Sequence, residues 1–349
     1  MKVKSDSLAA ESVKPATLAE PEPGEVTGAG NDPGDDQASG SGALADQPLS
    51  RGPSSGSANV EPLVFTETTP SGIIVEYQAQ PKRLYRVNGV EVPSVTTVLG
   101  VLDKPALPWW GMKIGVQGVL ELWNQGEIDS AIDWVERATV ASLVITSEPV
   151  KPATLENVVD LLTKNKLTVN HVRDKAGDRG LAVHDVFEQW AAGYPNDLPI
   201  VWEEDLGDQK GYLDGLEKFI KAANPEPLAA EVMVGSVLHG FAGRYDIRLR
   251  LHEPREVVVK ALKKPKTETI PAGTYLCDLK TSSGVYPNTH FRQLEAYEEA
   301  SVECGYEPTD ARYVIHVKSD GTYQFVKSTA DFEDFLAVLE VYQSNQRLK

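Results

Sequence analysis

Two strand-like segments that carry acidic residues restrict the folds open to this chain. Polar and apolar residues alternate over residues 242–251, which predicts a strand with Asp246 on one face. A second strand is predicted over residues 275–280. Because side chains alternate across a strand, Asp278 and Lys280 share a face there. If the two strands pair antiparallel, the two carboxylates converge on one site. The same alternation places Arg244 and Arg248 on the face of Asp246.

Converging carboxylates are ligands for a hard divalent cation, which favours oxygen donors and keeps several waters. A neighbouring lysine can orient a water molecule or neutralise developing charge, so the set has the geometry of phosphodiester hydrolysis. An acid and a lysine two residues apart are also common by chance. For the triplet Asp278-Leu279-Lys280 alone, a surface ion pair on a strand is the more frequent explanation.

Two pairs of residues at helical spacing accompany these strands. Gly180 and His184 are one turn apart in a helix predicted over residues 177–190, and Gln293 and Tyr297 are one turn apart in a helix that follows the second strand. Taken singly, such a histidine is more often an ordinary core or surface residue, and such a Gln/Tyr pair is more often ordinary helix surface. The order of all these features carries more information than any one of them.

In that order, and with Glu231 between the first helix and the first strand, the motifs resemble the PD-(D/E)xK nuclease superfamily, most closely its RecB-type exonuclease branch, many of whose members bacteriophages encode. The resemblance covers roughly residues 80–330 and includes Pro93-Ser-Val-Thr96, similar to a "PSVT" segment of phage nucleases. It implies an α/β fold with a restriction-endonuclease-like core: a central mixed sheet of about five strands flanked by helices.

The resemblance also implies roles for the matching residues. The metal would be Mg²⁺, held by His184, Asp246, Asp278 and the backbone carbonyl of Leu279, and Mn²⁺ is an expected substitute because imidazole is a softer ligand. Lys280 would serve the attacking water, and Glu231 would help to organise the catalytic site. The residues expected to contact DNA or to brace the site are Arg244, Thr281, Arg292, Gln293 and Tyr297.

Two features depart from the pattern of the superfamily. Residues 251–266 lengthen the interval between the two acidic strands, which predicts an inserted hairpin or long loop. Cys277 and Cys304 are the only cysteines, whereas an iron–sulfur cluster of the type found in some RecB-like nucleases needs four, so no such cluster is expected. The sequence has no glycine-rich phosphate loop, and no nucleotide cofactor is predicted.

The composition divides the chain into a tail and one domain. Residues 1–62 are rich in Ala, Gly, Ser, Pro, Asp and Glu, which predicts a disordered acidic tail. Residues 63–349 form the predicted nuclease domain, with a helical N-terminal subdomain over 105–175, a catalytic core over 176–330 and a final helix over 331–349. A hairpin is predicted at Ser319-Asp-Gly321. Tryptophans 109, 110, 123 and 134 are predicted to be core residues rather than platforms for bases.

The charge argues against a broad basic surface. The tail has four bases and ten acids, so −11 of the net charge of −17 belongs to the remainder. A local groove is nevertheless enough to hold phosphates. The candidates for it are Lys175, Arg179, Arg244, Arg292 and the lysines at 260, 263, 264 and 266, for which solvated loop lysines are the alternative.

No secretory signal and no membrane-spanning stretch is visible, so the protein is expected in the cytoplasm, that of a bacterial host if a phage encodes it. The function we expect is Mg²⁺-dependent exonuclease activity on DNA in phage recombination, repair or replication. The alternatives are an endonuclease with the same site, an inert DNA-binding or scaffold protein of the same fold, and a DNA mimic that blocks a nuclease. The tail either recruits a recombinase or a single-strand-binding protein or keeps the enzyme soluble, and no oligomeric state is indicated.

Overall fold

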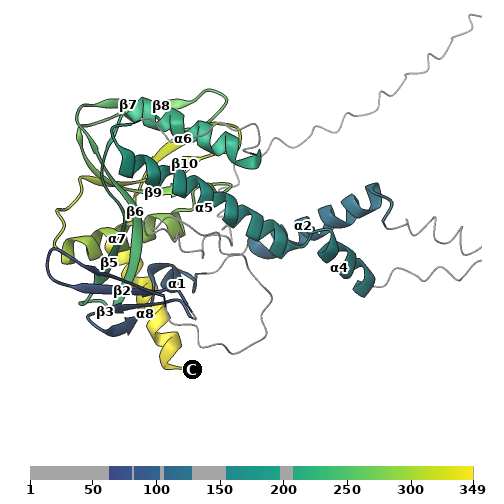
Figure 1. The fold of residues 1–349 in the computed structure, drawn as a ribbon, viewed down its shortest axis with the longest axis horizontal. Coiled ribbons are helices and arrows are strands. Elements are labelled where there is room, and N and C mark those ends of the chain that lie inside the picture. Colours follow the sequence, from purple (N-terminus) through teal and green to yellow (C-terminus); the bar gives the residue numbers. More distant parts are fainter. Residues whose placement is uncertain (1–62, 81, 103–105, 128–154, 197–206, 349) are drawn as a thin grey trace, which may run out of the picture.

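A mixed five-stranded sheet lies at the centre of the structure, a computed structural model that describes residues 63–80, 82–102, 106–127, 155–196 and 207–348 (Figure 1). In spatial order the strands are β11 (Tyr323–Lys327), β10 (Ala311–Val317), β9 (Gly273–Lys280), β6 (Phe241–Leu251) and β5 (Glu226–Ser236). The β9–β10 pair is parallel, and every other neighbouring pair is antiparallel. The predicted mixed α/β sheet of about five strands is confirmed.

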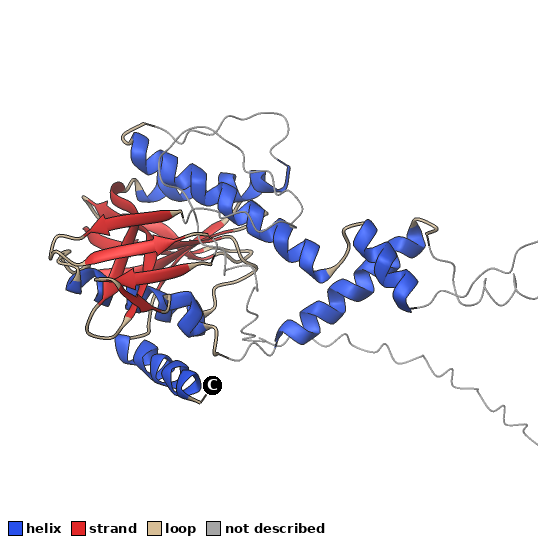
Figure 2. Cartoon of the chain, turned by 60° about the horizontal axis from the view of Figure 1, so that its bottom comes forward, coloured by secondary structure: helices blue, strands red, loops and turns tan. Residues whose placement is uncertain are grey.

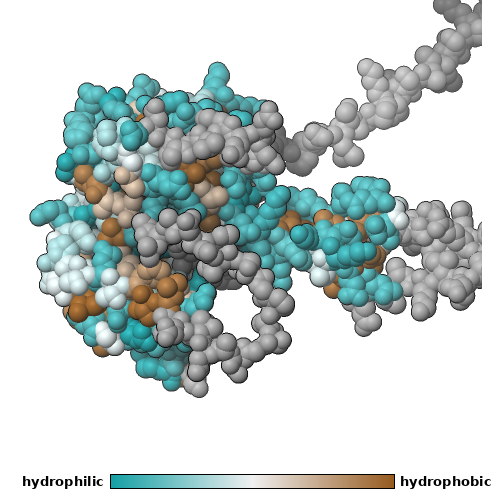
Figure 3. Space-filling model, viewed as in Figure 1, coloured by the Kyte–Doolittle hydropathy of each residue, from teal (hydrophilic) through white to brown (hydrophobic). Residues whose placement is uncertain are grey.

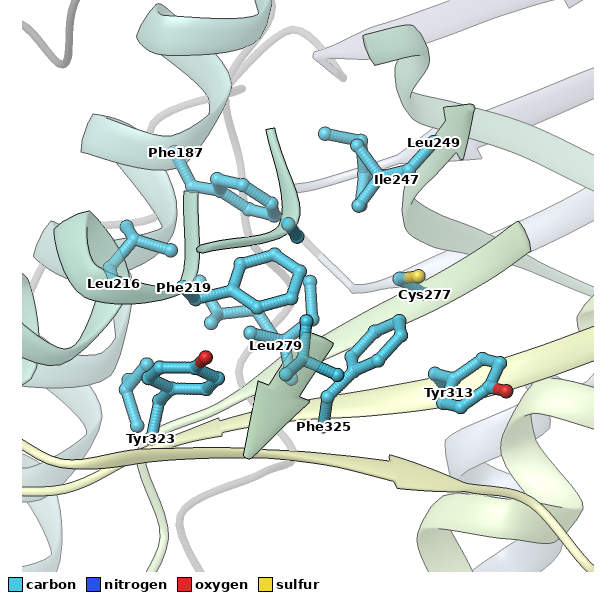
Figure 4. Close-up of a cluster of buried hydrophobic side chains, with 14 of the residues drawn as sticks. Phe187, Leu216, Phe219, Ile247, Leu249, Cys277, Leu279, Tyr313, Tyr323 and Phe325 are labelled. Atoms are coloured by element: carbon cyan, nitrogen blue, oxygen red, sulfur yellow. The ribbon is translucent and has the colours of Figure 1, made fainter. Parts of the chain in front are cut away.

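Helices cover both faces of this sheet (Figure 2). On one face α5 (Val169–Gly193) and α6 (Lys210–Ala223) bury Phe187, Leu216 and Phe219 against alternate residues of β6, β9, β10 and β11 (Figure 4). The other face is covered by α7 (Arg292–Glu303), which follows the π-helical turn η3 (Pro287–Phe291), and by α8 (Phe332–Arg347). Burial on both sides explains why β9 reads as an almost unbroken buried run.

A second sheet, which the sequence analysis did not predict, packs on β5. Its four antiparallel strands are β1 (Val64–Thr68), β2 (Ile74–Gln78), β3 (Leu84–Val87) and β4 (Val90–Val92), called here the N-terminal meander. Gly235 permits the contact, since a Cβ atom there would lie 2.6 Å from a methyl group of Val87. The short helix α1 (Val95–Leu99) follows, and the Ser94 side chain caps its first turn.

The long interval between the acidic strands is an inserted hairpin, as predicted. It consists of β7 (Arg255–Lys260) and β8 (Lys266–Ile270), which pair antiparallel with each other as a separate two-stranded sheet. Val257 and Ile270 of this hairpin join the core beneath α5 and α6. The insertion therefore leaves β6 and β9 free to pair antiparallel, which confirms that prediction as well.

An α-helical arm projects from the body of the molecule (Figure 1). It contains α2 (Ala106–Asn124) and α4 (Leu155–Lys164), joined to the body through the N-terminal part of α5. The prediction that the tryptophans are core residues is wrong for Trp109 and Trp123, which are 68% and 52% exposed, because α2 buries a different stripe against α4 and α5. Hydrophobic residues are accordingly visible on the surface of the arm (Figure 3). Trp110 is partly buried, while Trp134 and the helix expected near it lie outside the described residues.

The C-terminal elements agree with the sequence. The turn at Ser319-Asp-Gly321 joins β10 to β11, and Gly321 has a φ of 75°. Asp331 and Asp334 form a capping box at the start of α8.

The predicted tail over residues 1–62 lies outside the described residues. Within the described part of the chain, no helix is long and apolar enough to span a membrane.

Candidate functional site

Asp278 and Lys280 share a face of β9, as their spacing predicts. The Lys280 Nζ atom lies 3.1 Å from Asp278 Oδ2, and the Asp278 side chain is only 1% exposed. A charge at that depth is costly unless a partner of opposite sign stays close. The Asp278–Lys280 pair is therefore a buried ion pair and not the exposed surface ion pair that is the more frequent explanation for such a triplet.

Asp246 is fixed to the strand that carries this pair. The main-chain ladder between β6 and β9 ends at Ile247–Cys277, one residue short of the point where Asp246 and Asp278 would stand opposite each other. Beyond it, the Asp246 Oδ2 atom accepts a hydrogen bond from the backbone N–H of Leu279 at 2.7 Å. The Asp246 side chain thus takes the place of a main-chain hydrogen bond between the two strands. It is attached to Leu279, the middle residue of the Asp-x-Lys motif.

His184 reaches the same carboxylate from α5. Its Nδ1 atom lies 3.6 Å from Asp246 Oδ2, and both side chains are largely buried. Gly180, one turn earlier, lets the helix approach β9, because a Cβ atom there would be 3.3 Å from the Thr281 hydroxyl oxygen. This close approach gives a physical reason for the Gly-x-x-x-His spacing.

Glu231 stands opposite Asp246 on the neighbouring strand, between the paired positions Ala230–Ile247 and Val232–Tyr245. It lies in the middle of β5, a strand between the predicted helix and the strand of Asp246. Its φ of 53° is unusual for a residue with a side chain, and such a conformation costs on the order of 1–3 kcal/mol. The buried Glu231 carboxylate lies 2.9 Å from the Arg244 Nε atom.

His184, Glu231 and Asp246 each place one ligand atom so that all three lie within 4.8 Å of one another. One imidazole nitrogen and two carboxylate oxygens fit Mg²⁺ or Mn²⁺. The set differs from the one expected from the sequence, because Glu231 takes the place of Asp278 in this group of described residues. Asp278 instead holds Lys280 beside it.

A cavity with a volume of about 1210 Å³ lies at this group, and Glu231 and Asp278 are not among the described residues that line it. Of the residues expected at the site, those that line it are His184, Arg244, Asp246, Leu279, Lys280, Thr281, Gln293 and Tyr297. Gln293 Nε2 donates a hydrogen bond to the Tyr297 hydroxyl at 3.2 Å, which confirms that the two share a helix face. The Tyr297 ring fills the space beside Gly243, where a Cβ atom would lie 2.5 Å from it.

The Pro-Ser-Val-Thr segment forms part of the same cavity. Pro93, Ser94 and Thr96 line it, and the Pro93 carbonyl accepts a hydrogen bond from the Ala242 N–H at 3.1 Å. This bond attaches the end of the N-terminal meander to β6, four residues before Asp246. The segment therefore forms a second wall of the cavity beside the strands that carry Asp246 and Lys280.

Burial dominates the electrostatics around the site. Desolvation raises the pKa of the Glu188 carboxyl, and the nearby Arg244 guanidinium opposes the shift. Burial raises the pKa of Tyr85 to about 12, so its hydroxyl remains protonated at neutral pH. Burial likewise raises the pKa of Tyr297. Tyr85 and Tyr297 therefore contribute neutral phenols to the cavity.

The cations of the cavity are mostly ones that the sequence analysis missed. They are Lys82, Arg83, Arg244, Lys280 and Arg347, against the acids Glu91 and Asp246. Lys82 and Arg83 precede β3, and Arg347 ends α8, so no local motif connects them to the Asp-x-Lys strand. Only the folded chain brings these segments to one surface.

Other basic residues proposed for a groove lie elsewhere. Arg292 contacts Asp334 and the Asn288 carbonyl beside α8, and Arg179 lies over the Tyr212 ring. Lys175 forms an ion pair with Asp208, and the lysines at 260, 263, 264 and 266 belong to the β7–β8 hairpin and the turn within it.

The expectation that Arg248 shares a face with Asp246 is wrong. Arg248 donates to the Glu307 carbonyl and lies over the Tyr306 ring, near Glu298 of α7. Ile247 belongs to the core under α5, the side from which His184 reaches Asp246, so strict alternation fails between Asp246 and Ile247. The failure coincides with the end of the β6–β9 ladder and with the left-handed backbone of Glu231 opposite.

Comparison with known proteins adds no relative: no protein-family model matches the chain, and a search of curated proteins found no match.

Proposed function

We propose that this protein is a metal-dependent deoxyribonuclease with a restriction-endonuclease-like core, and that it hydrolyses DNA phosphodiester bonds with Mg²⁺ or, as a substitute, Mn²⁺. One observation carries the proposal. The ligand atoms of His184, Glu231 and Asp246 lie together, and the buried Asp278–Lys280 pair lies across the end of the β6–β9 ladder from them. Asp246 and Lys280 line the same cavity, in which cations outnumber acids.

The donor set suits a divalent cation because it combines two carboxylates and one imidazole in a largely buried position. When bound there, the cation supplies Lewis acidity toward a phosphate oxygen and lowers the pKa of a water molecule. Leu279 holds Asp246 in place through its N–H, and Arg244 holds Glu231. Such supporting bonds orient metal ligands and typically change affinity or activity by about 10–100-fold when removed.

Lys280 contributes a fixed positive charge. Its ammonium group has donors only, and Asp278 Oδ2 at 3.1 Å limits its position. In the proposed reaction it donates a hydrogen bond to the attacking water or to a phosphate oxygen, where negative charge develops. The reaction consumes one water, breaks one P–O bond and leaves a phosphate monoester and a hydroxyl group.

Among nucleases, we propose an exonuclease that acts in phage DNA recombination, repair or replication. The support is the ordered motif set, which resembles the RecB-type branch, together with the position of the Pro-Ser-Val-Thr segment in the cavity wall. The DNA strand is the expected partner, because a cavity with excess positive charge concentrates phosphates even on an acidic protein.

The decisive experiment is a hydrolysis assay with Mg²⁺, Mn²⁺ or EDTA on end-labelled linear DNA and on closed circular DNA. The proposal expects metal-dependent release of nucleotides from the linear substrate, an intact circle, and loss of both metal-supported rates in Lys280→Ala. Lys263→Ala, which removes a lysine on the β7–β8 turn, is the matched control and should behave as wild type. Cleavage of the circle would assign an endonuclease, and no hydrolysis of any DNA by folded wild-type protein would overturn the proposal.

A further inference from the structure

The cavity has a second wall that no catalytic residue occupies. We call it the outer wall and define it by the cavity-lining residues of the N-terminal meander, α1 and the end of α8. It faces the catalytic elements α5, β6 and β9, which line the cavity through His184, Asp246 and Lys280. The outer wall thus borders the site while contributing nothing to the donor set described above.

Positive charge is concentrated on this wall. Lys82 and Arg83 directly precede β3 and Arg347 lies in the last turn of α8, whereas Glu91 is the one acid among the described residues of the wall. This excess of cations occurs in a chain of net charge −17. In an acidic protein, such a local reversal of sign inside a concave surface indicates an anionic ligand.

The elements that carry the wall are packed against the rest of the fold. Across the meander, Phe65 pairs with Tyr77 and Tyr77 pairs with Tyr85, with ring centroids 6.3 Å and 4.8 Å apart. At the other end, α8 is anchored to the sheet by Phe335, whose ring centroid lies 4.9 Å from that of Phe241. The three cations therefore lie at the ends of two packed elements that are far apart in the sequence.

We infer that the outer wall is a binding site for the phosphodiester backbone, in which Lys82, Arg83 and Arg347 contact phosphates of the strand whose scissile bond lies at the catalytic residues. The inference rests on the proposed function, because it assigns the substrate's path through that site. Lysine and arginine contacts with phosphates carry no sequence information, so the wall positions the strand without selecting bases. Each contact also releases counterions, which makes binding weaken with added salt.

The test measures binding without turnover. Full-length protein is titrated in EDTA against a fluorescein-labelled oligonucleotide, as a single strand and as a duplex, and anisotropy is followed over a series of salt concentrations. For Lys82→Ala/Arg83→Ala we expect affinity to fall by about tenfold and the slope of log K against log salt to shrink by roughly 1.5, since each phosphate contact contributes about 0.7–0.9. Arg347→Ala should reduce the slope by about half as much.

The matched control is Lys263→Ala/Lys264→Ala, which removes two adjacent exposed cations from the β7–β8 turn and should leave affinity and slope unchanged. Arg83→Lys, which keeps the charge, should retain the wild-type slope and guards against a folding defect. Loss with the single strand, the duplex or both supports the wall and identifies the form it holds. Unchanged DNA affinity in the wall variants, or an equal loss of affinity in the control variant, would overturn the proposal that the outer wall binds phosphates. If the wall substitutions weaken DNA binding but the wild-type protein hydrolyses no DNA, the proposed nuclease function is wrong. The assignment of the outer wall as a phosphate-binding site is then still supported.

Discussion

The Asp246 Oδ2 atom accepts the backbone N–H of Leu279 at 2.7 Å, so the carboxylate of one strand takes the place of a main-chain bond on the next. His184 Nδ1 lies 3.6 Å from the same oxygen. Asp246 is therefore both a support for the Asp-x-Lys strand and a member of the donor group. Substitutions at this residue separate the two roles.

Asp246→Asn should abolish hydrolysis and preserve stability, whereas Asp246→Ala should damage both. Asparagine keeps an oxygen acceptor for the Leu279 N–H but loses the negative charge that a divalent cation requires. Alanine leaves that partly buried donor without its partner, at a cost of about 1–3 kcal/mol. Urea unfolding and a nuclease assay on both variants check the expectation. Equal stability of the two would show that the hydrogen bond contributes nothing.

Lys280→Met should remove activity and also destabilise the fold, because the Asp278 carboxylate is 1% exposed and loses its cation at 3.1 Å. The expected loss is about 3–5 kcal/mol, the range for removing one partner of a buried ion pair. The double variant Asp278→Asn/Lys280→Met should recover part of that stability and none of the activity. A double-mutant cycle from urea unfolding measures the coupling, and a coupling near zero would contradict a buried pair.

Metal binding should raise the thermal unfolding midpoint of the wild-type protein. At a cation concentration about 100 times Kd the stabilisation is about 2.7 kcal/mol. Glu231→Gln should lose this Mn²⁺-induced shift, since Glu231 is one of the three clustered donors, whereas Asp278→Asn should retain most of it. The shift with and without Mn²⁺ is compared within each variant. If Asp278→Asn loses the Mn²⁺-induced shift and Glu231→Gln retains it, the metal ligands are those that the sequence predicts, with Asp278 in place of Glu231.

Gly243→Ala should destabilise the protein by about 1–3 kcal/mol, because the new Cβ atom would lie 2.5 Å from the Tyr297 ring. Gly115→Ala in α2 is the matched control. A Cβ atom there meets nothing within 4 Å, and alanine improves helix stability by roughly 0.5–1 kcal/mol. The denaturant midpoints of both variants are compared with that of the wild-type protein. The midpoint should fall for Gly243→Ala and rise for Gly115→Ala. A neutral Gly243→Ala would mean that Tyr297 moves away without cost.

The buried His316 should make stability depend on pH. Burial lowers its pKa from the ordinary 6.5, while the Ser282 carbonyl lies 2.7 Å from Nε2. The unfolded chain then binds the proton more readily, so the contribution of His316 is fully present above 6.5 and is lost as the pH falls toward the lowered value. The unfolding free energy of wild type minus that of His316→Gln should decrease between about pH 7.5 and about pH 5. A constant difference would exclude the titration.

Local patterns were sufficient to predict the two strands that carry Asp246, Asp278 and Lys280. The spacing of Asp278 and Lys280 also predicted that the acid and the lysine share a face, because strand geometry fixes that relation over a few residues. The antiparallel pairing of the two strands was a condition of the predicted site, and the structure meets it. The inserted hairpin and the capped final helix followed from equally local signals.

Relations between distant segments could not be predicted in this way. The N-terminal meander was missed, although Asn88-Gly89, both with positive φ, is a strong hairpin signal. The cations of the outer wall come from opposite ends of the domain, and only packing unites them. Arg248 and Glu231 depart from expectation where backbone geometry changes locally, which the spacing of side chains does not encode.

The length of α5 has a mechanical consequence. This helix has 25 residues, its first turns contact the arm, and His184 lies fifteen residues after Val169, which corresponds to roughly 22 Å along the axis. One continuous helix therefore joins the projecting arm to His184, a candidate metal ligand. The part of α5 that carries His184 is packed against the sheet through Val183 and Phe187, so the same helix that supports the arm also fixes the imidazole beside Asp246.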